Sequence, residues 1–164
     1  MVLVYVVLPY FNPIEGNNDI NSNSIITEVN SDLYKVIRVV DGDTIIIDLN
    51  DKEEYVRFIG VDTPESVHPD PEKNTNLGEL SSAFTKEHLE GKYISIELDV
   101  QDRDKYGRIL AYVYLNDEMF NKTLLAAGMA QLATFPPNVK YVEEFQLIQN
   151  VARENNVGLW YYWK

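Results

Sequence analysis

Short segments of β-branched and aromatic residues, separated by turn-forming residues, dominate the chain between residues 34 and 60. Such segments predict β-strands, and the pairs Asp41-Gly42 and Asn50-Asp51 between them predict tight turns. Three strands are predicted in this way, at 34–40, 44–49 and 54–60. Because the connections are short, we expect these strands to form an antiparallel meander.

Helical and strand-like spacing alternate in the rest of the chain. Apolar residues at 80, 83, 84 and 88/89 recur at the helical period, which predicts a helix over 78–89 that ends before Gly91. Two alternating strands follow, joined by a polar loop, at 93–100 and 108–115. Two further helices are predicted, at 120–127 before Gly128 and at 141–154.

The order of these elements is three strands, one helix, two strands and two helices. It fits a mainly β member of the α+β class, namely a five-stranded Greek-key barrel of the OB-fold type with about three helices. The length of 164 residues allows one such domain, which we place at residues 34–164.

Residues 1–33 differ from this domain in composition. Residues 1–11 are apolar apart from Pro9, too few to span a bilayer as a helix but as long as the apolar region of an export signal. The first basic residue is Lys35, so the positive start of such a signal is missing, and a strand or an apolar tail is the alternative. Residues 12–33 contain six Asn, which favours a flexible tether. The export interpretation predicts a secreted or cell-surface protein.

The charge of the chain argues against one class of partner. Lys and Arg number 14 against 26 Asp and Glu, a net charge of −12, which is the wrong sign for holding a polyanion by overall attraction. The absence of cysteine excludes disulfides, thiolate catalysis and cysteine-bound zinc. The two histidines, His68 and His88, lie in different contexts, and we expect structural roles for both.

Acidic residues cluster where the predicted meander turns. Asp41 and Asp43 flank the first turn, and Asp62 and Glu65 follow the third strand together with Thr63. An Asp-Gly pair alone is common in ordinary tight turns. A meander, however, brings its third strand back toward the first turn, where so many carboxylates repel one another unless a cation is bound. Oxygen donors of this kind suit Ca²⁺ or Mg²⁺ and not zinc or copper.

Basic residues accompany this acidic cluster at two places. Arg57 interrupts an otherwise apolar strand, and Lys105, Tyr106 and Arg108 lie at the tip of the second hairpin. A charged hairpin tip is commonly no more than solvated. An EF-hand starting at Asp102 is excluded, because its twelfth position is not a glutamate. The remaining interpretation is that both arginines face the acidic cluster and bind a phosphate through their planar guanidinium groups.

The segments DGDT, RFIGVDTPE, DKYGRILAYVY and AAGMA together resemble the thermonuclease family, the staphylococcal-nuclease-like domain, over residues 34–163. The resemblance implies an OB-fold phosphodiesterase that uses Ca²⁺ to cleave DNA and RNA to 3′-phosphate products. No obligate protein partner is evident from the sequence, and we expect a monomer. It also implies a role for each matching residue. Asp43, Asp62 and the Thr63 carbonyl bind calcium with Asp41 in support, Glu65 is the candidate general base, Arg57 and Arg108 hold the scissile phosphate, and Lys105 and Tyr106 contact a neighbouring phosphate.

One segment departs from the family pattern. Many members carry two tyrosines after the AAG helix, whereas this chain has Ala133, Thr134 and Phe135 there. Phe135 offers a face for stacking on a nucleobase but has no hydroxyl group. Two other functions stay open at this point: a non-catalytic nucleic-acid-binding OB module, and a structural calcium-binding barrel.

Overall fold

A computed structural model describes residues 33–66 and 75–163 of the chain. The elements in chain order are β1 (Tyr34–Asp41), β2 (Thr44–Asp48), β3 (Glu53–Phe58), β4 (Val61–Asp62), α1 (Asn76–Leu89), β5 (Tyr93–Glu97), β6 (Ile109–Leu115), β7 (Glu118–Met119), α2 (Phe120–Ala126), β8 (Gln131–Leu132), α3 (Val142–Glu154) and the 3₁₀ helix η2 (Gly158–Tyr161). The predicted export segment, most of the predicted tether and His68 lie outside the described residues. Within them, no helix combines the length and apolarity that crossing a membrane requires.

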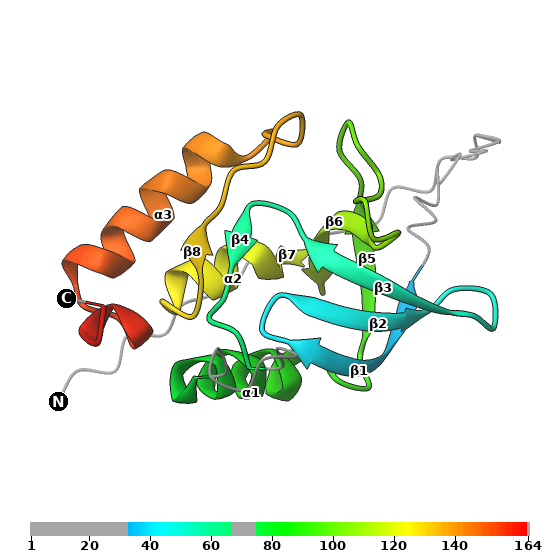
Figure 1. Cartoon of the computed structure of the whole chain (residues 1–164), viewed down its shortest axis with the longest axis horizontal. Coiled ribbons are helices and arrows are strands. Elements are labelled where there is room, and N and C mark those ends of the chain that lie inside the picture. The colour runs from blue at the N-terminus through cyan, green and yellow to red at the C-terminus, as the bar shows by residue number, and fades with distance from the viewer. Residues whose placement is uncertain (1–32, 67–74, 164) are drawn as a thin grey trace, which may run out of the picture. The chain divides into compact units, whose positions relative to one another are not determined.

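The predicted meander closes into a barrel. Strands β1, β2 and β3 pair antiparallel, and β5 and β6 pair antiparallel as a second hairpin. Parallel pairing of Val56 to Phe58 with Ile109 to Ala111 joins β3 to β6 and closes the mixed five-stranded barrel (Figure 1). Three α-helices accompany the barrel, so the predicted α+β, OB-type fold is confirmed.

The core lies inside this barrel because alternate strand residues are apolar. Val36, Ile45, Val56, Ile94 and Val113 each come from a different barrel strand and are completely buried. On one side of the barrel, α2 packs against α3 and adds further apolar side chains to the same core, among them Leu124, Leu125 and Phe145 (Figure 1).

Helix α1 forms where it was predicted, but the residues that it buries differ from the expected apolar set. Its buried positions are Gly78, Ser81, Thr85 and Leu89, whereas Leu80 is half exposed. The Ser81 hydroxyl donates to the Met129 carbonyl and the Thr85 hydroxyl to the Gly42 carbonyl, both at 2.6 Å. Periodicity of apolar residues could not show this face, because small polar residues pack it against the turn after β1.

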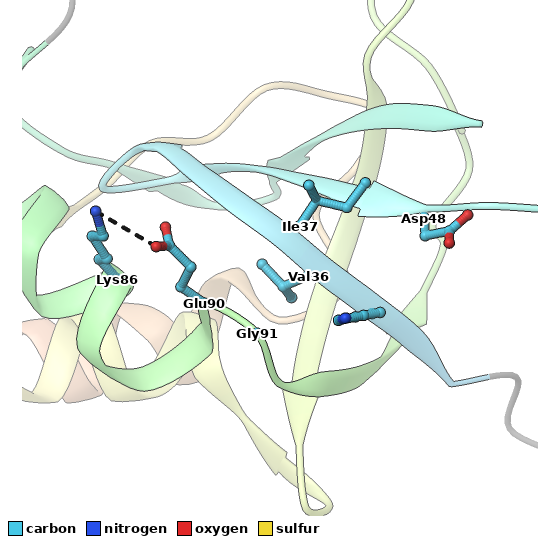
Figure 2. Close-up of a pocket in the computed structure, with 7 residues that line it drawn as sticks. Val36, Ile37, Asp48, Lys86, Glu90 and Gly91 are labelled. Atoms are coloured by element: carbon cyan, nitrogen blue, oxygen red, sulfur yellow. Dashed lines mark ion pairs between the residues drawn. The ribbon is translucent and has the colours of Figure 1, made fainter. Parts of the chain in front are cut away.

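A hollow of about 580 Å³ lies between β1 and the end of α1 (Figure 2). β1 pairs with β5 only at Tyr34 and Lys35, and farther along the strand the Glu90 carboxylate accepts a hydrogen bond from the Val39 amide at 3.1 Å. Glu90 also faces Lys86 at 3.5 Å. The residues that line the hollow come mainly from β1 and from the end of α1, and there the Glu90 carboxylate supplies the acceptor that a neighbouring strand would give to the Val39 amide.

Candidate active site

The turn between β1 and β2 is fastened to the segment that follows β4. Asp41 is 9% exposed, and its Oδ1 accepts hydrogen bonds from the Gly42 amide at 2.8 Å and from the Ser66 hydroxyl at 2.6 Å. A side chain on Gly42 would overlap Thr63 and Ser81, so only glycine permits this close approach. The meander thus returns to the first turn, as its short connections predicted.

Asp43 connects three parts of the site. Its side chain is buried, and Oδ1 accepts from the Thr44 hydroxyl at 3.0 Å. Oδ2 accepts from the Thr63 amide at 2.9 Å and the Thr63 hydroxyl at 3.1 Å, and it lies 3.1 Å from Nη2 of Arg57. Through this carboxylate, β2, β3 and β4 meet at one end of the barrel.

Arg57 lies between the two candidate metal-binding carboxylates. Its Nη2 contacts Asp43 and donates to Oδ1 of Asp62 at 2.8 Å. Its Nη1 donates to the carbonyls of Phe58 at 2.9 Å and Val61 at 2.7 Å. The guanidinium therefore supplies part of the positive charge that the acidic cluster requires.

Asp62 is accessible to solvent, with 61% of its side chain exposed. Partial burial raises the pKa of Asp62; the Arg57 guanidinium opposes this effect, and the negative charges of Asp43 and Asp41 reinforce it. The three carboxylates therefore lie close enough to influence one another.

One hollow of about 320 Å³ is lined by all three predicted catalytic residues, whereas Asp62 and Thr63, two of the predicted metal-binding residues, are not among its lining residues. Asp41, Asp43, Arg57, Glu65 and Arg108 all line it. Glu65 is positioned by the start of α1, because the Thr75 amide donates to its carbonyl oxygen at 3.0 Å and Gly78 packs directly on it. Two arginines and three acids thus face one space, which is wide enough for a phosphate group.

The chemistry of the donors suits a hard divalent cation. In the described part of the chain, no three side chains of His, Cys, Asp or Glu gather closely enough to bind a metal by themselves. A cation here would therefore draw on main-chain and water oxygens besides Asp43 and Asp62. Several acids lie close together at this end of the barrel, so a bound cation would reduce the repulsion among them.

A second hollow of about 470 Å³ continues from the first. Arg57 and Arg108 line both hollows, and Lys105, Tyr106 and Phe135 line the second. The Lys105 ammonium lies 5.0 Å from the centre of the Tyr106 ring. Tyr106 and Phe135 are 73% and 70% exposed, so both rings are open to a ligand. All three predicted substrate-binding residues are therefore brought together beside the arginines.

Several supporting residues gave no signal in the sequence. Asn138 is 4% exposed; its Oδ1 accepts from the Gln101 amide and its Nδ2 donates to the Gln101 carbonyl, both at 2.8 Å. This pair of bonds ties the loop before β6 to the loop before α3, and those loops form the walls of the second hollow. Ser66 and Gly78 were missed as well, because contacts between distant segments leave no local pattern.

Comparison with known proteins agrees with this geometry. A sequence model of the family described as "Staphylococcal nuclease homologue" matches residues 55–162, which is more than half of the chain. The chain belongs to the staphylococcal nuclease family. The matched range includes Arg57, Asp62, Thr63, Glu65 and Arg108.

Relatives within the staphylococcal nuclease family extend the match. The chain is 42% identical to a thermonuclease of Staphylococcus intermedius over 163 residues, covering 98% of this chain and 94% of the relative. It is 44% identical to a thermonuclease of Staphylococcus hyicus, covering 82% and 79%. It is 39% identical to endonuclease YncB of Bacillus subtilis, covering 75% and 59%. Because the first of these covers nearly the whole chain, it spans the Asp41–Thr44 turn as well.

Proposed function

We propose that this nuclease, a hydrolase of phosphodiester bonds, uses Ca²⁺ to cleave DNA and RNA and leaves 3′-phosphate ends. The observation that supports the proposal most directly is the hollow in which Arg57 and Arg108 face Asp41, Asp43 and Glu65. Relatives named thermonuclease and endonuclease support the reaction class. A bare nucleic-acid-binding module has no need for buried carboxylates next to its phosphate-binding arginines.

Asp43, Asp62 and the Thr63 carbonyl are the residues that would hold the ion, with Asp41 in support. When bound, Ca²⁺ supplies a Lewis acid for a phosphate oxygen and offsets the negative charge of the site. The carboxylate of Asp43 is already oriented by the Thr63 amide and hydroxyl. A bound ion would share the Asp43 oxygens with the donors that already contact them, which come from Thr44, Thr63 and Arg57.

The two arginines stabilise the negative charge of the reacting phosphate. Arg108 binds the non-bridging oxygens of this phosphate, and Arg57, which also lines the hollow, contributes positive charge. Planar guanidinium groups match the geometry of phosphate, and charge that develops in the transition state strengthens these contacts. Lys105 binds a neighbouring phosphate, while Tyr106 and Phe135 receive bases.

Glu65 takes the proton of the attacking water. The oxygen of that water forms the new bond to phosphorus, and the bond from phosphorus to the 5′ oxygen breaks on the opposite side. The 5′ oxygen leaves with a proton from solvent. The carbonyl of Glu65 is held by the start of α1, so its position beside the hollow does not depend on the substrate.

Metal removal tests the proposal. We expect single-stranded DNA, plasmid DNA and RNA to be cleaved with Ca²⁺, cleavage to stop with a calcium chelator, and activity to return when Ca²⁺ is restored. Gel analysis of the products and phosphatase sensitivity of their 3′ ends provide the measurement. Cleavage that persists under chelation contradicts the cofactor, and binding without cleavage under every condition identifies a non-catalytic module instead.

A further inference from the structure

Asp104 organises the loop that carries the substrate-binding residues. Its Oδ1 accepts hydrogen bonds from the amides of Tyr106 at 2.9 Å and Arg108 at 3.0 Å. Its main-chain oxygen accepts from the Gly107 amide at 3.0 Å, and its amide donates to the Arg108 carbonyl at 3.0 Å. Gly107 has φ +85°, a conformation that glycine adopts without strain. One carboxylate thus closes the turn around Lys105 and Tyr106.

The other oxygen of the same carboxylate holds the side chain of Arg108. Oδ2 of Asp104 accepts from Nε of Arg108 at 2.7 Å, a short charge-assisted bond. Burial raises the pKa of Asp104, but hydrogen bonds from Arg108 and Tyr106 lower it by more than burial raises it. The net pKa of Asp104 therefore lies below its ordinary value. Asp104 is therefore ionised at neutral pH.

In the Asp104–Arg108 pair, different nitrogens of the guanidinium are used for holding the side chain and for contacting a ligand. The bond to Asp104 uses Nε of Arg108. The two terminal nitrogens of Arg108 form no hydrogen bond or ion pair with the residues that the structure describes. Arg108 lines both hollows of the site, and Asp104 lines the second. The nitrogens that match two phosphate oxygens are thus left available while the group itself is held.

We propose that Asp104 is the positioning residue for Arg108: it holds the guanidinium through Nε so that both terminal nitrogens face the scissile phosphate. This inference rests on the proposed nuclease function. A flexible arginine must be ordered during the reaction, whereas one held in advance stabilises the transition state without that cost. The transition state, in which charge accumulates on the phosphate, depends on this orientation more than substrate binding does.

The variant Asp104→Asn isolates the side-chain bond. An amide retains one oxygen that can accept from the main-chain amides of the loop, but its NH₂ group cannot accept from Nε of Arg108. We expect kcat on single-stranded DNA to fall about 10- to 100-fold with a much smaller change in KM. Asp102→Asn is the matched control, because it removes the same charge from the same loop and Asp102 has no side-chain bond to Arg108. It should leave kcat within about threefold of the parent.

A double-mutant cycle distinguishes positioning from general stabilisation. In the Arg108→Ala background, Asp104→Asn should have almost no further effect on kcat, because the group that it positions is gone. Equal kcat for Asp104→Asn and Asp102→Asn overturns the proposal, and so does full multiplication of the two effects in the double variant. If the parent protein itself cleaves no nucleic acid, the proposed nuclease function fails, and the proposed role of Asp104 in catalysis fails with it.

A measurement on the parent protein does not depend on the folding of any variant. In a ¹H–¹⁵N spectrum, the Nε–H of Arg108 should exchange with solvent at least tenfold more slowly than the Nε–H of Arg38, which is exposed on β1. A hydrogen-bonded and partly buried group exchanges slowly because it must first open. Equal exchange rates for the two arginines show that Arg108 is not held and overturn the proposal.

Discussion

The two arginines of the site are held in opposite ways. Arg57, whose side chain is 14% exposed, uses its terminal nitrogens on the carbonyls of Phe58 and Val61 and on the carboxylates of Asp43 and Asp62. Arg108 is 32% exposed and is held through Nε by a single acid of its own loop. The first arginine belongs to the junction of β2, β3 and β4, and the second belongs to a hairpin tip.

The difference shows how one site combines rigidity with access. Around Arg57, the bonds that would orient the metal-binding acids are also bonds that hold the end of the barrel together. Around Arg108, the loops are joined to one another by a few polar contacts, such as the partly buried Asn138–Gln101 pair. Substitutions in the first region should therefore affect folding and activity together, and substitutions in the second should affect activity with less effect on folding.

Replacing each arginine by alanine is the strongest test of this comparison. Both variants should lose at least about a hundredfold in kcat: Arg108→Ala removes a donor of about 3–4 kcal/mol to the transition state, and Arg57→Ala removes the cation that lies between Asp43 and Asp62. Arg57→Ala should also lower the free energy of unfolding by about 3 kcal/mol, since it leaves Asp43 buried without its cation. Arg108→Ala should cost about 1 kcal/mol or less, as for a partly exposed pair. Urea unfolding and steady-state kinetics at neutral pH provide both quantities.

Lys52→Ala is a suitable control, because Lys52 lies in the exposed turn between β2 and β3. Its unfolding free energy and its kcat should both stay close to those of the parent. Equal losses of stability in the two arginine variants would contradict the comparison, and a nearly normal kcat in either variant would remove that arginine from the site.

The same contrast explains what the sequence could predict of the fold. The strands and turns of the meander follow from residues that are neighbours in the chain, so the alternating β-branched segments predicted them, and Asn50 and Asp51 do adopt the positive φ values of a tight turn. The buried face of α1 depends on contacts with Gly42 and Met129, far away in the sequence. Periodicity placed that helix correctly but not its packing.

For the site, the sequence predicted residue types better than bonds. The repulsion among the acids was expected to call for a cation, yet Arg57 lies between Asp43 and Asp62 and supplies part of that charge. The position of Arg57 in an otherwise apolar strand was the feature of the sequence that indicated a role for this arginine at the acidic cluster. Asn138, in contrast, acts through two bonds to the main chain of Gln101, and no local pattern of residue types reveals such a contact.

Phe135 tests the loop side of the comparison at intermediate strength. It is 70% exposed beside Tyr106, so Phe135→Ala should remove a stacking face without disturbing the barrel. Stacking of a base on an aromatic ring is worth about 1–3 kcal/mol, which corresponds to an increase of KM of about 5- to 150-fold. The expected kcat and melting temperature are unchanged, because Phe135 touches neither the reacting phosphate nor the core.

Phe135→Tyr, which restores the hydroxyl seen in many family members, serves as the matched variant. It should keep the KM of the parent within about threefold, since the ring face is retained. A decrease in kcat for Phe135→Ala with no change in KM would argue against a role in binding bases.

Glu97 provides the smallest expected effect and tests how the loop side is held to the barrel. Its carboxylate accepts hydrogen bonds from Nζ of Lys140 and the Tyr114 hydroxyl, both at 2.6 Å, and from the Tyr141 hydroxyl at 3.1 Å. Burial raises the pKa of Glu97, but these hydrogen bonds lower it by more than burial raises it. The net pKa of Glu97 therefore falls below its ordinary value of 4.5.

A lowered pKa in the folded state means that Glu97 stabilises the protein above pH 4.5 and that this contribution is lost as the pH falls through the folded-state value. At pH 7, Glu97→Gln should be less stable than the parent by about 1–2 kcal/mol, and the difference should be smaller at pH 3, which is below the ordinary pKa of 4.5. Urea unfolding at both pH values measures this difference, with Glu53→Gln as the control because Glu53 is exposed at the start of β3. A difference that is the same at both pH values would mean that the charge of Glu97 does not hold this loop. Glu97 does not line either hollow of the active site, so kcat at pH 7 should not change in Glu97→Gln. A change of stability without a change of kcat is the behaviour expected on the loop side of the site, away from the metal-binding acids.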